Sequence, residues 1–150
     1  MDIGSAMKRE VVWLSVNATL EEAIQLLIKH RIGLLPLLDE GKKLLGILNL
    51  NDILSLAWPT FIKMIEDYDF VHDFGAMETS HLSETVRTRP VSEFMQTPTS
   101  VPEDCGLLRA AAVMKQHRLR DIPVVDAENS LVGLASWVDV GIAFLREWHS

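Results

Sequence analysis

Near the C-terminal end of the chain, Gly133, Ser136 and Asp139 have the types and spacing to hold a small polar ligand. A glycine lets the backbone approach a bound group closely, and a hydroxyl with a carboxylate can hold two vicinal hydroxyls of a sugar. The helix expected to begin here would also favour an anion. However, Ser-x-x-Asp is also a helix capping box, in which both side chains satisfy backbone amides. The pattern alone is more often a cap, although the two roles are compatible.

These residues belong to the second copy of an internal repeat. The stretches 29–53 and 116–140 align without a gap, because His30 and His117 are separated by the same interval as every other matched pair (117 − 30 = 87). The other pairs are Arg31–Arg118, Pro36–Pro123, Asp39–Asp126, Leu44–Leu131, Gly46–Gly133 and Asp52–Asp139. Solenoid repeats are shorter, roughly 20 to 50 residues. The sequence therefore predicts two copies of a small α/β unit.

Each copy is predicted to have the order β-α-β-β-α, an α/β (α+β) fold. The strands expected in copy one are 11–16, 34–38 and 44–48, with helices starting at the capping box Thr19–Glu22 and at Asn49. Copy two repeats the pattern with a strand at 99–101 and helices at 107–117 and 137–148. Copies this small bury too little surface alone. We therefore expect one pseudo-twofold module with a cleft on either side of the junction.

The predicted organisation is a first copy at 7–58, a helical and acidic linker at 59–90 and a second copy at 91–150. Residues 1–6 are expected to be dispensable. The net charge of −7 without a basic block argues against nucleic acid as a partner. No apolar run approaches the roughly 18 residues of a membrane helix. The single Cys105 cannot form an intrachain disulfide, and it favours a reducing, cytoplasmic location.

The recurring elements resemble a known family. An apolar helix, an x-Pro-apolar strand, an aspartate turn and a glycine six residues before an aspartate occur twice in the same order. Each copy resembles a CBS domain, and the whole resembles a stand-alone CBS pair, or Bateman module. The resemblance implies a regulatory, non-catalytic module that binds an adenosine-containing ligand (AMP, ADP, ATP or S-adenosylmethionine), with no obligatory cofactor. It also implies a homodimer that signals to an effector protein by conformational change.

The family's nucleotide motif, a glycine, two apolar residues, Ser or Thr, any two residues and Asp, matches copy two from Gly133 to Asp139. The ligand-binding residues that the resemblance implies there are Ser136, Asp139, Arg120, Ile122, Pro123, Gly133, Ser100, Val101 and Trp137. Copy one departs from the motif because Asn49 replaces the hydroxyl residue. We therefore expect a weaker second site, formed by Asn49, Asp52, Gly46 and Leu35.

Few cations are available to bind phosphate. Arg120 is followed by Asp121, which would repel an anion. The side chains of His117, Arg118 and Arg31 lie at predicted helix ends, where a cation complements the helix dipole, although each could reach across a cleft. This sparse charge favours a ligand with one or two phosphates, or an adenosyl compound with little charge.

Several alternatives remain open. The motif residues could serve only as caps in a dimerisation or scaffold module. An effector domain could also be missing here, because many members of the family that the chain resembles are attached to transporters or enzymes. An enzyme is disfavoured because no P-loop or activated nucleophile is present. A cluster at 67–73 (Asp67, Asp69, His72 and Asp73) could gather a divalent metal, but a solvated acidic linker is the commoner explanation, so no metal site is predicted. For Trp13, Trp58 and Trp148, core or dimer-interface packing is the commoner role, whereas Trp137 is the exception because it lies inside the nucleotide motif.

Overall fold

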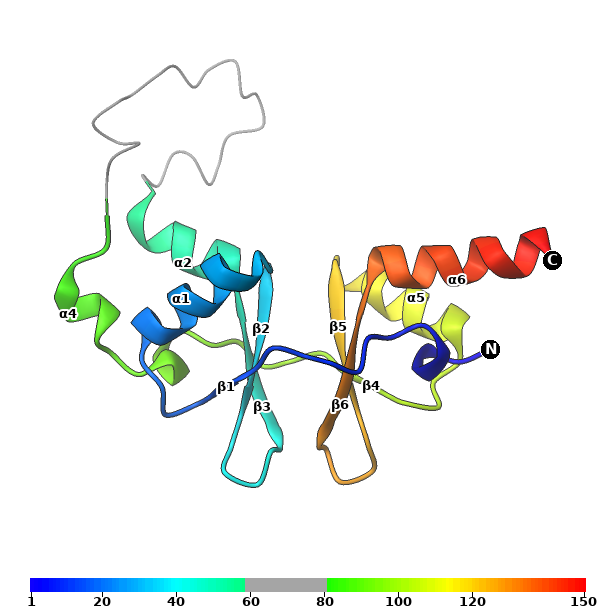
Figure 1. Ribbon diagram of the computed structural model, residues 1–150, viewed down its shortest axis with the longest axis horizontal. Helices are drawn as coiled ribbons and strands as arrows, with labels where there is room; N and C mark the ends of the chain where they lie inside the picture. The colour runs from blue at the N-terminus through cyan, green and yellow to red at the C-terminus, as the bar shows by residue number, and fades with distance from the viewer. Residues whose placement is uncertain (59–80) are drawn as a thin grey trace, which may run out of the picture.

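The computed structural model describes residues 1–58 and 81–150, and it contains the predicted β-α-β-β-α order twice (Figure 1). The elements of copy one are β1 (Leu14–Ser15), α1 (Leu20–His30), β2 (Leu34–Leu38), β3 (Leu44–Asn49) and α2 (Leu50–Ala57). Those of copy two are β4 (Val101–Pro102), α5 (Leu107–Gln116), β5 (Asp121–Val125), β6 (Leu131–Ser136) and α6 (Trp137–His149). Short helices η1 (Ile3–Ser5), α4 (Glu84–Arg87) and η4 (Val91–Glu93) lie outside this pattern.

Each copy forms a three-stranded sheet, in the order β1-β2-β3 and β4-β5-β6. The first strand of each sheet runs parallel to the second, and the second pairs antiparallel with the third. The left-handed backbone positions also repeat, since Arg31 and Arg118 have φ of 52° and 55°, and Lys42 and Asn129 have φ of 62° and 63°. The predicted repeat is therefore confirmed in strand pairing and backbone conformation.

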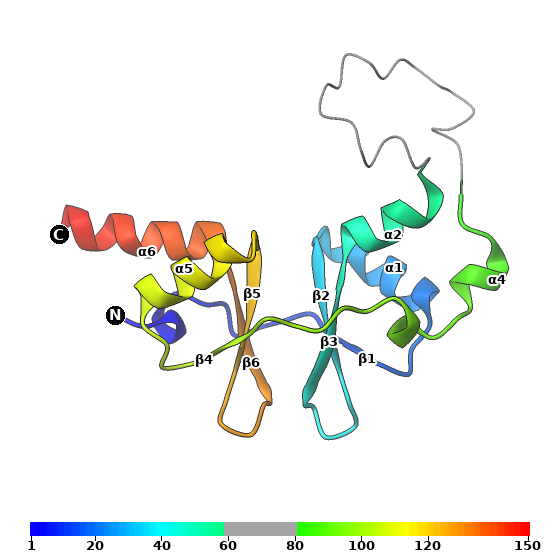
Figure 2. The same cartoon turned by 180° about the vertical axis from the view of Figure 1, so that it is seen from behind.

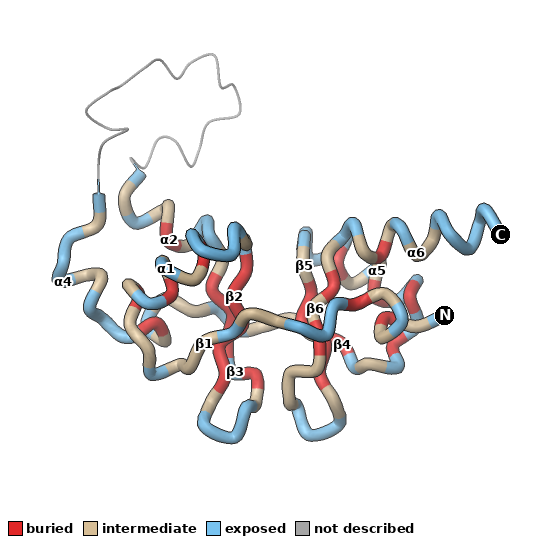
Figure 3. Tube along the Cα trace, in the orientation of Figure 1, coloured by how far each residue is buried: buried red, intermediate tan, exposed pale blue. Residues whose placement is uncertain are grey.

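The two copies form one module because their β-hairpins meet. The backbone N–H of Leu44 donates to the carbonyl oxygen of Asn129 (3.0 Å), and the Asn129 side-chain amide donates back to the Leu44 carbonyl (3.0 Å). Leu38, Leu44 and Val125 form a buried cluster across this junction. In Figure 1 the β2–β3 and β5–β6 hairpins stand next to each other, and the helices of each copy lie on its outer side. Buried residues are concentrated in these strands (Figure 3).

The N-terminal residues pack on copy two, which argues against the expectation that residues 1–6 are dispensable. Ile3 has 0% exposure and lies in the core of copy two, and its backbone N–H donates to the Cys105 carbonyl (2.8 Å). Val91 in η4 is buried in the core of copy one in the same way. We call residues 2–8 and 90–96 the entry segments, because each packs on one copy before the chain crosses to the other. The two crossings run over opposite faces of the module (Figures 1 and 2).

The predicted first strand of each copy needs correction. In copy one the strand extends only over Leu14–Ser15 instead of 11–16, because only these residues pair with β2. In copy two the strand is Val101–Pro102 instead of 99–101. Within the predicted linker, Ser83 caps the helix α4, since its side chain accepts the N–H of Val86. The linker boundaries 59–90 stay a prediction, and the aspartates and histidine at 67–73 lie outside the described residues.

Candidate functional site

Both motif aspartates lie at helix starts and cap them. At α6 the Ser136 hydroxyl accepts the N–H of Asp139 (3.0 Å), and Asp139 Oδ2 accepts the N–H of Ser136 (2.9 Å). At α2 the N–H of Asn49 donates to Oδ2 of Asp52 (3.0 Å). The capping role expected from the Ser-x-x-Asp spacing is therefore present. In each aspartate, one carboxylate oxygen is left for another partner.

That remaining oxygen faces an entry segment. The ammonium of Lys8 lies 3.8 Å from Oδ1 of Asp139, and the side-chain amide of Gln96 donates to Oδ1 of Asp52. Lys8 pairs in a short antiparallel bridge with Leu134, and Gln96 pairs with Ile47. The two contacts are therefore structurally equivalent, but one donor is charged and the other is neutral.

The motif glycines make room for methionines of the entry segments. A Cβ at Gly133 would overlap the sulfur of Met7, and a Cβ at Gly46 would overlap the sulfur of Met95. Both glycines are buried. Close approach of a neighbour is thus the reason for glycine here, and the neighbour in this structure is a methionine side chain.

The larger cleft between the copies lies beside Asn49, and we call it the Asn49 cleft. Its volume is about 510 Å³, which is within the usual range for small-molecule sites. Copy one contributes 33–34 and 49–52, the entry segment contributes Gln96, and copy two contributes 117–121. The start of α2 therefore faces the basic side chains that follow α5, namely His117, Arg118 and Arg120.

The second cleft, which we call the Lys8 cleft, is smaller, at about 290 Å³. Its walls come from the crossing segment after Lys8 and from both copies. The charged residues that line it are Lys8, Glu10, Arg31 and Asp121. Two cations and two carboxylates thus line the Lys8 cleft, and the Asn49 cleft likewise combines Arg118 and Arg120 with Asp52 and Asp121, with His117 in addition.

Asp121 is common to both clefts. It is half-buried, and burial raises the pKa of its carboxyl. The nearby cations of Lys8 and Arg120 act in the opposite direction, whereas the Asp139 carboxylate adds to the increase. An ionised carboxylate at this point repels a phosphate placed in either cleft.

The predicted site residues are spread over several surfaces. Asn49, Asp52, His117, Arg118 and Arg120 line the Asn49 cleft, and Arg31 lines the Lys8 cleft. Trp137 and Arg120 border a hollow of about 260 Å³ beside α5. The residues Leu35, Gly46, Val101, Ile122, Pro123 and Gly133 are buried, and Ser100 is half-buried. Ser136 and Asp139 meet as a cap, and their role in binding ribose stays a prediction.

The sequence reasoning did not identify Gln96 and Lys8. Both lie in the entry segments, where Ile3, Met7 and Lys8 correspond to Val91, Met95 and Gln96 at an interval of 88 residues (96 − 8). Copy one therefore has one residue more than copy two between the entry segment and the stretch that aligns at an interval of 87. A search that allowed a single gap would have found the correspondence.

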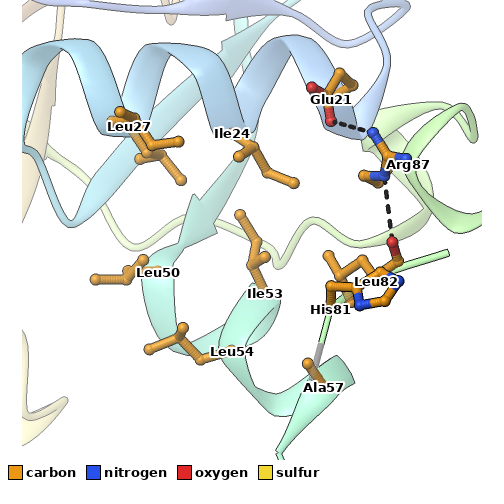
Figure 4. A pocket seen from close by; sticks show the side chains of 11 residues that line it. Glu21, Ile24, Leu27, Leu50, Ile53, Leu54, Ala57, His81, Leu82 and Arg87 are labelled. Atoms are coloured by element: carbon orange, nitrogen blue, oxygen red, sulfur yellow. Dashed lines mark hydrogen bonds and ion pairs between the residues drawn. The ribbon is translucent and has the colours of Figure 1, made fainter. Parts of the chain in front are cut away.

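A largely apolar groove lies on copy one, away from the junction (Figure 4). It has a volume of about 510 Å³ and lies between α1 and α2, with Leu27, Ile53 and Leu82 among its lining residues. The ion pair of Arg87 with Glu21 (3.4 Å) lies at its polar edge. Within the described residues, no group of three or more potential metal ligands occurs, and no helix of these ranges is long and apolar enough to cross a membrane.

The comparisons with known proteins agree with this geometry. A sequence-family model described as "CBS domain" matches residues 2–58 and 91–143. The chain therefore belongs to the CBS domain family, as two repeats in tandem. It is 31% identical over 146 residues to the chloroplastic CBS domain-containing protein CBSX1 of Arabidopsis thaliana, covering 93% of this chain and 61% of that protein.

Other relatives differ widely in length. The chain is 29% identical to the CBS domain-containing protein YhcV of Bacillus subtilis, covering 93% of this chain and 83% of YhcV. It is 28% identical to inosine-5'-monophosphate dehydrogenase of Aquifex aeolicus over 91% of this chain, but it spans only 23% of that enzyme. The structure of CBSX2 from Arabidopsis thaliana superposes with a TM-score of 0.77 at 22% identity, covering 99% of this chain and 97% of CBSX2. These matches show the fold of a CBS pair.

Proposed function

We propose that this chain is a regulatory module that binds an adenosine-containing ligand between its two CBS repeats and signals occupancy to a partner protein. The observation that carries the proposal is the Asn49 cleft, in which the start of α2 faces His117, Arg118 and Arg120 from the other copy. A carboxylate for ribose and cations for phosphate then lie on opposite walls. A ligand that touches both copies can change their relative arrangement if it prefers one arrangement.

Relatives with bound ligands support the ligand class. CBSX2 has been solved in complex with AMP, with a TM-score of 0.72 to this chain at 21% identity. The CBS pair of MJ0100 has been solved with 5'-methylthioadenosine and S-adenosylmethionine, with a TM-score of 0.70 at 22% identity. Those ligands share an adenosyl group. We propose that the same group is recognised here, without a catalytic step and without an obligatory cofactor.

The geometry changes the ranking of the two sites. The sequence favours the copy-two residues Ser136 and Asp139, but the larger cleft lies beside Asn49 and Asp52, and His117, Arg118 and Arg120 of the other copy line it. Asparagine at position 49 keeps hydrogen-bonding capacity. We therefore place the principal site in the Asn49 cleft and the weaker one near Asp139.

Isothermal titration of AMP, ADP, ATP and S-adenosylmethionine tests the function. The matched pair Asp52→Asn and Asp139→Asn makes the same change at equivalent helix starts. We expect Asp52→Asn to weaken binding at least about tenfold, because a charged acceptor is lost, and Asp139→Asn to have a smaller effect. Absence of binding of all four compounds to the folded wild-type chain would overturn the sensor.

A scaffold module is the second candidate, and one observation favours it. In both aspartates each carboxylate oxygen already faces a donor of the protein itself. If the titrations detect no ligand, the motif residues serve to cap helices and hold entry segments.

Self-association is part of the proposal. The outer face of α6 exposes Val138, Ile142, Leu145 and Trp148 by 68%, 41%, 55% and 75%. Their helical spacing forms a continuous apolar stripe, and such patches commonly mark protein interfaces. We propose that a second copy of the chain covers this stripe in a homodimer.

We also propose a reducing, cytoplasmic location, which the single, buried Cys105 fits.

A further inference from the structure

The two entry segments hold the motif aspartates with donors of different charge. Each aspartate uses Oδ2 to accept a backbone N–H of its own helix start. In each, Oδ1 is the oxygen that a ligand hydroxyl could use. At Asp52 this oxygen is held by the neutral amide of Gln96, whereas at Asp139 it faces the ammonium of Lys8 at 3.8 Å.

We propose that Lys8 is a latch that keeps the Asp139 carboxylate from a ligand, and that Gln96 is its weaker counterpart at Asp52. The entry segments thereby decide which of the two carboxylates is the first to bind a ribose hydroxyl. This inference rests on the proposed function, because it assigns the order in which the two sites of that function are filled.

The difference in donor charge explains why a ligand should displace Gln96 from Asp52 more readily than Lys8 from Asp139. A hydroxyl that replaces the Gln96 amide exchanges one neutral donor for another, so the Asp52 carboxylate keeps a hydrogen bond of the same kind. A hydroxyl that replaces Lys8 must instead separate an ammonium from a carboxylate, which forfeits the Coulomb attraction between the two charges. The Lys8 side chain is 71% exposed and that of Asp139 is 17% exposed. Because the ammonium of Lys8 is largely solvated, we expect an effect of about two- to fivefold in affinity.

The backbone anchoring of the entry segments limits what a ligand can displace to the side chains of Lys8 and Gln96. Met7 packs on Gly133 and Met95 packs on Gly46, one residue before Lys8 and Gln96. Backbone hydrogen bonds join Lys8 to Leu134 (2.9 Å) and Gln96 to Ile47 (3.0 Å). A ligand can therefore displace the side chain of either residue while the segment remains attached to the strand.

The chain offers a reciprocal test, in which Lys8→Gln and Gln96→Lys give each entry segment the residue of the other. Adenosine, which is uncharged, and AMP are titrated into both variants, with Lys29→Gln on the exposed surface of α1 as the charge control. We expect Gln96→Lys to weaken both ligands about two- to fivefold, and Lys8→Gln to tighten binding at the Asp139 site by a similar factor.

The AMP titration separates the latch from general electrostatics. A cation added at position 96 without a latch would attract the phosphate and tighten AMP binding. Tighter AMP binding to Gln96→Lys, or unchanged affinities in both variants, would therefore overturn the latch while leaving the proposed function intact. Binding to Lys8→Gln alone would support the latch and refute the choice of Asp52 as principal site. Absence of binding to wild type and to Lys8→Gln would refute both proposals.

Discussion

At the scale of single residues, Asp121 breaks the symmetry of the module most clearly. Its counterpart in copy one is Leu34 (121 − 34 = 87), which is buried at the start of β2. Asp121 instead places a half-buried carboxylate on the walls of both clefts. A charge retained at a junction where the other copy has leucine lowers stability unless it is protonated or paired.

Replacing Asp121 with asparagine is expected to stabilise the chain at pH 7 by up to about 1 kcal/mol. Because burial raises the pKa of Asp121 in the folded state, folding favours the protonated form. The associated stability is fully present below the unfolded pKa of about 3.9 and is lost as the pH rises through the folded pKa. The advantage of Asp121→Asn should therefore shrink towards pH 4. Urea unfolding at both pH values measures this difference.

Glu128→Gln is the control for that prediction, because it removes a carboxylate from an exposed turn of the same copy. A variant Asp121→Asn that is no more stable than wild type at pH 7 would contradict the account. An advantage over wild type that persisted unchanged at pH 4 would also contradict it.

Residue types alone predicted only part of the site. The interval of 87 residues identified Asn49, Asp52, His117 and Arg118 as equivalent or neighbouring positions, and the structure brings these four to one cleft. It could not indicate that the basic residues of copy two face the aspartate of copy one. Which repeat supplies each wall depends on how the copies pack, and this is not encoded in the motif of either copy.

At the scale of elements, the entry segments join the two copies. Each contributes a buried aliphatic side chain, Ile3 or Val91, to the core of one copy before crossing to the other. The chain therefore cannot be divided into two independent domains at the boundaries of the sequence repeat. The strand predicted at 11–16 is short for the same reason, since this stretch is largely a crossing between copies.

Truncating Ile3 to alanine is expected to lower the free energy of unfolding by about 2–4 kcal/mol, the usual cost of deleting a buried aliphatic side chain. Chemical denaturation measures the change. Ile28→Ala is the matched control, because Ile28 on α1 is 68% exposed, and it should change stability by less than about 0.5 kcal/mol. Equal effects of the two substitutions would show that the N-terminal segment does not pack as described.

At the scale of the whole molecule, the exposed apolar face of α6 is the surface that we propose for self-association. We expect the chain to self-associate, and Leu145→Glu to weaken the dimer at least about tenfold, because it places a charge in the apolar stripe. Sedimentation velocity over a range of concentrations measures both species. Leu108→Glu is the control, since Leu108 on α5 is 75% exposed and lies outside the stripe. A wild-type chain that stays monomeric at high concentration would refute the homodimer.

The central claim is that one ligand contacts both copies, and an NMR titration of AMP into the ¹⁵N-labelled chain tests it most directly. Asn51 and Leu119 line the same cleft from different copies, and each has a backbone amide that reports on its surroundings. We expect both to shift together and to saturate with a single dissociation constant. Shifts confined to one copy, or centred on Ser136 and Asp139, would contradict a ligand site in the Asn49 cleft.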